Sequence, residues 1–144
     1  MPEAGERKDP FGAFNFLVEI DGIIEAGFNS VSGLDISVEF DTIREGGVND
    51  FEYKLPKGLK YSEITLRKGL ADWELWTWCQ DFALGKSGRK NGTIHLLDDS
   101  KNQVMSWHFI QAYPAKWTGP SLDATKSAVA TESLVLAHQG LFKG

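Results

Sequence analysis

The feature that most constrains the fold of this chain is an unbroken alternation of apolar and polar residues from Leu34 to Asp41. Successive side chains of a β-strand point to opposite faces, so this spacing predicts a strand with one apolar face and one polar face. We expect the strand to continue to about Ile43. Its polar face consists of acidic and hydroxyl side chains, namely Asp35, Ser37, Glu39 and Asp41.

A glycine-containing segment from Gly46 to Gly58 follows this strand directly. It is longer than a hairpin turn and carries three bulky residues, Phe51, Tyr53 and Leu55. Loops of this length with aromatic side chains of their own commonly have a function. We therefore predict a contact loop here, although a loop folded over its own subunit fits the same pattern.

Composition indicates a globular protein with β structure and one domain. The chain has 144 residues, of which 42% are hydrophobic and 15 are glycine. That length is sufficient for a single hydrophobic core. Residues 1–12 combine two prolines with mixed charges, so we expect a flexible N-terminal arm followed by one domain at residues 13–144.

Targeting signals, cysteine usage and net charge limit the cellular compartments and the classes of partner that fit this chain. The sequence has neither an apolar run near the roughly 20 residues of a membrane helix nor a signal-peptide core. Its single cysteine, Cys79, excludes an internal disulfide and fits a reducing compartment. We expect synthesis in the cytoplasm and no membrane insertion. The net charge of −5 argues against a general nucleic-acid-binding surface.

Local patterns predict six or seven strands and one helix in all. The other strands are expected at residues 14–20, 23–28, 59–67, 93–97, 104–111 and 128–138. A hairpin turn is expected at residues 98–102. Residues 113–125 contain breakers such as Pro114 and are expected to be irregular, and residues 140–144 to form a short tail.

The helix is expected between Asp72 and Gly85. The Asp72 carboxylate can accept from free amides of the first turn, and Gly85 can adopt the left-handed conformation that closes a helix. Trp73 falls on the polar side of this helix. Leaving a tryptophan in water forgoes roughly 2 kcal/mol of burial, so we expect either a loop of the same subunit or a neighbouring subunit to cover it.

The sequence lacks the constellations that catalysis or metal binding requires. His95, His108 and His138 do not have metal-site spacing and are expected to be hydrogen-bonded structural residues. Cys79 lies on the apolar arc of the predicted helix, and the Asp98-Asp99 pair is most simply a turn former. Neither a nucleophile elbow nor a phosphate-binding loop occurs. We expect no catalytic residue, no metal and no cofactor.

Four short segments, in this order, carry a resemblance to a known family. They are residues 29–34 (NSVSGL), 64–69 (ITLRKG), 119–124 (GPSLDA) and 129–132 (VATE). From about Phe14 to Gly140, their order and spacing resemble the tail tube proteins of contractile-tailed phages. Among these, the chain is similar to the inner tube subunits of phage-tail-like contractile injection systems.

The resemblance implies a mainly β fold, in which two steeply packed antiparallel sheets form a β-barrel-like sandwich with one flanking α-helix. The ring protein of type VI secretion, hemolysin-coregulated protein, shares this fold. The resemblance also implies that six copies close into a ring by joining their sheets, and that rings stack into a tube inside a contractile sheath. The implied partners are further copies, sheath subunits, baseplate and tail-terminator proteins, and effector or DNA cargo in transit.

The resemblance favours particular roles for the residues singled out above. The polar face of Asp35, Ser37, Glu39 and Asp41 is expected to line the pore, although a solvated outer face would have the same pattern. The contact loop between rings is expected to include Val48, Asn49, Asp50, Phe51, Glu52, Tyr53, Lys54 and Leu55. Trp73 is expected at a contact between subunits. A negative, hydroxyl-lined wall would repel DNA phosphates and acidic cargo.

The function expected from the resemblance is structural and not enzymatic. The chain would self-assemble into the inner tube that conducts DNA or effectors after sheath contraction, within a phage virion or an injection particle released extracellularly. One alternative with the same fold is a baseplate tube-initiator or a secreted ring protein. A second alternative, from a different class, is a monomeric β-sandwich binding module.

Overall fold

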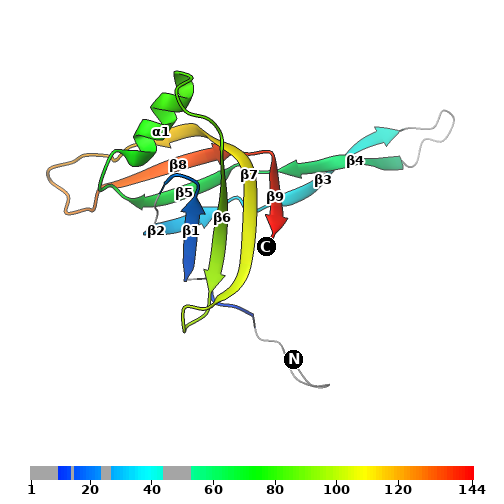
Figure 1. Cartoon of the computed structure of the whole chain (residues 1–144), viewed down its shortest axis with the longest axis horizontal. Helices are drawn as coiled ribbons and strands as arrows, with labels where there is room; N and C mark the ends of the chain where they lie inside the picture. The colour runs from blue at the N-terminus through cyan, green and yellow to red at the C-terminus, as the bar shows by residue number, and fades with distance from the viewer. Residues whose placement is uncertain (1–9, 14, 24–26, 44–52) are drawn as a thin grey trace.

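The computed structural model describes residues 10–13, 15–23, 27–43 and 53–144 (Figure 1). Within these residues the chain forms nine strands and one helix, more strands than the sequence patterns predict. The elements are β1 Phe16–Ile20, β2 Phe28–Ser32, β3 Ile36–Ile43, β4 Tyr53–Tyr61, β5 Ile64–Gly69, α1 Glu74–Ala83, β6 Lys90–Leu97, β7 Gln103–Thr118, β8 Thr131–Ala137 and β9 Gly140–Lys143.

Two antiparallel sheets run steeply across each other and share the long strand β7 (Figure 1). The first sheet contains β1, β6, β9 and the first half of β7; the second contains β2, β5, β8 and the second half of β7. The sheets do not close into a barrel. The core between them includes Val18, Ile20, Phe28, Ile64, Leu66, Ile94, Phe109, Leu134 and Leu136.

Strand β7 changes sheets at a corner near Gln111, whose φ is 52°. Up to Ala112 β7 pairs with β6 and β9, and from Tyr113 onward it pairs with β8. The expectation of an irregular segment from residue 113 is therefore wrong up to Thr118. Pro114 fits into the strand because the ladder to β8 shifts between Pro114 and Lys116, and a bulge tolerates a residue without an amide hydrogen.

Three other predicted boundaries differ from the structure. The strand predicted at residues 23–28 is misplaced, because Ile23 forms only an isolated bridge to Ile20 and β2 begins at Phe28. The strand predicted at 59–67 is divided into β4 and β5. The expected tail at 140–144 contains β9, which completes the first sheet beside β7.

The predicted helix is confirmed as α1, although the residue at its N-cap position is Trp73, one residue later than Asp72. The Asp72 carboxylate accepts a hydrogen bond from the first helical amide, that of Glu74, at 3.0 Å. Gly85 has a φ of 75°, which ends the helix in the left-handed conformation. Leu75 and Trp78 are buried, so α1 packs one apolar stripe along β7. No helix of the described residues is long and apolar enough to cross a membrane.

The last segment that carries the family resemblance ends at Glu132, the one charged residue buried among those described. Its Oε1 accepts a hydrogen bond from the Trp117 indole Nε1–H at 2.9 Å, which links β8 to the end of β7. Its other carboxylate oxygen has no partner within the described residues. Loss of the bond to Trp117 would leave a second buried oxygen without a partner, which is costly, so the bond favours the observed pairing of β7 with β8.

Candidate assembly interface

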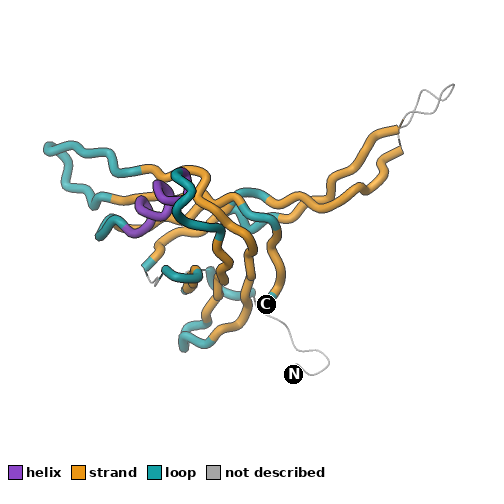
Figure 2. The backbone as a smooth tube through the Cα atoms, turned by 45° about the horizontal axis from the view of Figure 1, so that its top comes forward, coloured by secondary structure: helices purple, strands orange, loops and turns teal. Residues whose placement is uncertain are grey.

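Strands β3 and β4 form a two-stranded ribbon that projects far from the body of the molecule (Figures 1 and 2). The ribbon continues the β2–β5 pair in one register. Ser32 faces Thr65, and Ile36 faces Tyr61 four residues further along both strands. One long hairpin therefore supplies two strands of the second sheet and, beyond them, the projecting ribbon.

One face of the ribbon is apolar and open to solvent. Its large exposed side chains are Ile36 at 59%, Val38 at 55%, Phe40 at 47% and Leu59 at 55% of their full accessibility. A two-stranded hairpin is only marginally stable in water, and contiguous exposed apolar surface commonly marks an interaction site. The apolar face that the alternation predicts is therefore present, but a single copy of the chain leaves it uncovered.

The opposite face carries Ser37, Glu39 and Asp41, and every residue of the predicted pore-lining set, including Asp35, is exposed. The β4 strand adds positive charge beside these acids. Lys57 Nζ lies 3.3 Å from a carboxylate oxygen of Asp41. The face is therefore a mixture of acids, hydroxyls and lysines instead of a purely negative surface, and the structure of one copy leaves its place relative to a pore as a prediction.

The predicted contact loop differs from the structure in its second half. Residues 48–52 lie outside the described residues, whereas Tyr53, Lys54 and Leu55 belong to β4. Pro56 and Gly58 suggested a loop, yet both lie within β4. They are accommodated because β4 has a free edge and its ladder to β3 shifts once beside Pro56.

Trp73 is 66% exposed, so no loop of the described residues covers it. Its ring meets that of Trp76 edge-on, with centroids 5.5 Å apart. Leu84, at the other end of α1, is 61% exposed. Each end of α1 therefore exposes a large apolar side chain at a place distinct from the ribbon.

An open apolar cleft of about 390 Å³ lies between the two sheets beside β2. It is lined by Ala13, Phe16, Asn29, Ser30, Val31, Leu34, Ile94, Leu96 and Trp107. Sequence reasoning missed this cleft, because its lining comes from separate strands and no single segment has a pattern that reveals it. Leu59 and Tyr61 of the ribbon were also missed as candidate interface residues, although they alternate with lysine in β4.

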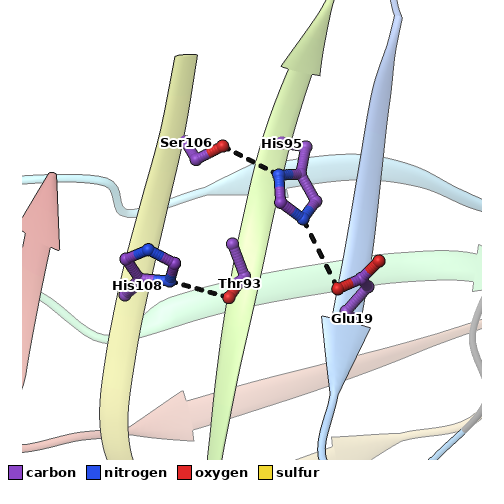
Figure 3. Close-up of polar contacts among 5 residues, drawn as sticks. All are labelled: Glu19, Thr93, His95, Ser106 and His108. Carbon is purple, nitrogen blue, oxygen red and sulfur yellow. Dashed lines mark hydrogen bonds and ion pairs between the residues drawn. The ribbon is translucent and has the colours of Figure 1, made fainter. Parts of the chain in front are cut away.

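His95, His108 and His138 all make polar contacts, as the sequence predicts, and the contacts of the first two are drawn in Figure 3. On the outer face of the first sheet, His95 Nδ1 and Ser106 Oγ share a 2.7 Å hydrogen bond, and His95 Nε2 lies 3.4 Å from Glu19 Oε2. His108 Nδ1 and Thr93 Oγ1 are 2.8 Å apart. Among the described residues no three His, Cys, Asp or Glu side chains are grouped to hold a metal ion.

Comparison with known proteins identifies the family to which this fold belongs. The model of the T4-like virus tail tube protein gp19 family matches residues 12–142. The chain belongs to this tail tube family. This result confirms the resemblance drawn from the sequence, and it places the chain among structural tail proteins and not among enzymes. No protein among the curated sequences matches the chain significantly.

Solved structures of contractile injection systems have the same fold as this tail tube protein. A chain of the PVC sheath–tube complex in the extended state is 34% identical, with a TM-score of 0.80 and coverage of 94% of this chain and 91% of that one. A chain of the PVC sheath/tube terminator is 33% identical, with a TM-score of 0.82 and coverage of 95% and 98%. A chain of the anti-feeding prophage baseplate is 25% identical, with a TM-score of 0.83 and coverage of 96% and 97%. The predicted fold class is thereby confirmed.

Proposed function

We propose that this tail tube protein is the structural subunit of the inner tube of a contractile injection system, and that six copies close into rings that stack into a hollow tube. The observation that carries the proposal is the family match across residues 12–142. Six copies agree with the 6-fold symmetry stated for the related anti-feeding prophage baseplate. Joining sheets around a ring would also remove the free strand edges of a single copy.

The partners we propose are those that surround the related proteins. The PVC relatives come from a sheath–tube complex and a sheath/tube terminator, and the prophage relative comes from a baseplate. We therefore propose sheath, terminator and baseplate proteins as neighbours of the tube, and an effector or DNA as the cargo it conducts after sheath contraction. The protein would be made in the cytoplasm and act in a phage-tail-like particle, including one released from the cell.

The residue roles remain part of the same proposal. The exposed acids and hydroxyls of β3, together with Asp35, would face the channel, where they would limit adsorption of DNA and acidic cargo. Residues 48–55 would contribute to ring-to-ring contacts. This is supported by β4, which begins at Tyr53 and belongs to the ribbon that projects away from the body. The exposed Trp73 would lie at a contact between subunits.

A baseplate tube-initiator is a second candidate function. It is favoured by the likeness to the prophage baseplate chain, whose TM-score is 0.83. An initiator would form a single ring that needs other baseplate proteins before further rings are added. A tube subunit would instead form stacked rings with copies of itself.

Electron microscopy of the purified protein over a range of concentrations tests the proposal. We expect rings or tubes with six-fold symmetry in end views. Single rings that never stack would favour the initiator. A strictly monomeric particle at high concentration, including after addition of the sheath partner, would contradict both functions.

A further inference from the structure

We propose that the apolar face of the β3–β4 ribbon in one copy docks into the open cleft beside β2 of a second copy. This inference rests on the proposed tube function and specifies which two surfaces meet when neighbouring copies assemble. Both surfaces belong to the same chain, so the partner is a second copy of this protein.

The cleft exists because the second sheet is too narrow to cover the first. Strand β2 is the last strand of the second sheet within the described residues, and β6 and β7 continue past it (Figure 1). The inner face of the first sheet is uncovered there, where Phe16, Leu96 and Trp107 line the cleft. An added strand beside β2 would extend the second sheet over these side chains.

The ribbon offers a strand that can pair with the free edge of β2 and apolar side chains that can fill the cleft beside it. A strand can add to a free β edge through main-chain hydrogen bonds while its side chains fill pockets beside that edge. The ribbon strands have eight and nine residues, and β2 has five, so either strand can span the edge. An apolar cavity of ~150 Å³ can hold a benzene ring, and this cleft of about 390 Å³ can therefore receive more than one ribbon side chain.

The contact must form between copies. In both overall views the ribbon continues the direction of the second sheet and leads away from β1, β2, β6 and β7 (Figures 1 and 2). These four strands carry most of the cleft lining, so the ribbon leads away from the cleft of its own chain. Ribbon and cleft are also different surfaces, so the contact is head-to-tail. A head-to-tail contact leaves one ribbon and one cleft free at each step, and it therefore repeats until a ring closes or a stack grows.

Cross-linking between two variants tests the contact. In a Cys79→Ser background, we place one new cysteine in each protein: Val38→Cys on the apolar face of the ribbon and Leu96→Cys in the cleft. Mixing the two proteins means that any Val38→Cys to Leu96→Cys disulfide joins different copies. The matched control replaces Val38→Cys by Glu39→Cys, whose side chain lies on the other face of the same strand. We expect several-fold more mixed disulfide dimer with Val38→Cys than with Glu39→Cys after assembly and mild oxidation.

The outcomes separate this inference from the proposed function. If rings or tubes form, but Val38→Cys gives no more dimer than Glu39→Cys, the docking inference is wrong and the tube function stands. If the parent protein forms neither rings nor tubes, the proposed function fails first. Should Leu96→Cys not fold, Val31→Cys supplies a second cysteine in the same cleft and gives the same two outcomes.

Discussion

Replacing Val38 by threonine should raise the protein concentration at which tubes form without unfolding the subunit. Val38 is 55% exposed in one copy, so assembly through the ribbon removes the remaining apolar surface from water. Full burial of a valine contributes about 2 kcal/mol, and covering the exposed half therefore contributes about 1 kcal/mol, or a factor of about five in concentration. Threonine keeps the β-branched shape of valine, so the ribbon itself should retain its strand conformation.

Sedimentation of tubes across a concentration series measures this threshold directly. We expect about a fivefold increase for Val38→Thr, largely independent of added salt because the lost interaction is apolar. Glu39→Gln is the matched control on the opposite face of the same strand, and its threshold should change much less. An unchanged threshold for Val38→Thr, with circular dichroism identical to the parent, would show that assembly does not cover this face of the ribbon.

Two further predictions concern the subunit itself. Gly92→Ala should lower the free energy of unfolding by roughly 1–3 kcal/mol, measured by urea denaturation, because its new methyl group would press on Phe109 and lie 2.6 Å from the Glu19 carbonyl oxygen. The second prediction concerns Asp123, whose pKa is lowered by hydrogen bonds from the Thr125 hydroxyl at 2.6 Å and amide at 3.0 Å. Thr125→Val should raise the Asp123 pKa toward its ordinary value in an NMR titration.

Each of these variants has an internal control. Gly69 has no atom within 4 Å of an added methyl group, so Gly69→Ala should be close to neutral. A Gly92→Ala protein as stable as Gly69→Ala would contradict the packing argument. The lowered pKa of Asp123 implies that its hydrogen bonds stabilise the loop at pH values above the ordinary carboxyl pKa. This stabilisation is lost as the pH falls through the lowered pKa. Parent and Thr125→Val titrations that coincide would refute this account.

The alternation in the sequence was sufficient to predict β3 and its two faces. Side-chain direction in a strand depends only on position along the chain, so the local pattern from Leu34 to Asp41 contains this information. The helix could be predicted equally well, since Asp72 and Gly85 act on their own neighbours at its ends. The role of the family in contractile tails came from the resemblance and not from these local patterns.

Features that depend on distant strands could not be predicted in this way. Pro114 suggests a chain break when read locally, yet β7 passes through it because a bulge beside β8 accommodates it. The strand conformation of residues 53–58 likewise depends on pairing with β3, which overrides the turn preferences of Pro56 and Gly58. The cleft arises only because β2 ends the second sheet before the first sheet is covered.

The ribbon exposes a strand edge with apolar side chains, and it also carries lysines that oppose unspecific pairing with that edge. A free edge with exposed apolar side chains invites indiscriminate strand pairing, and lysines along an edge strand oppose it. Strand β4 has three lysines, and Lys54 Nζ lies 4.8 Å from the centre of the Phe40 ring while Lys57 pairs with Asp41. Pairing is then favourable only where a partner offers apolar burial in addition to a free edge. Under our docking proposal, β2 and its cleft offer both. The ribbon of one copy therefore pairs preferentially with the cleft of another copy of the same chain.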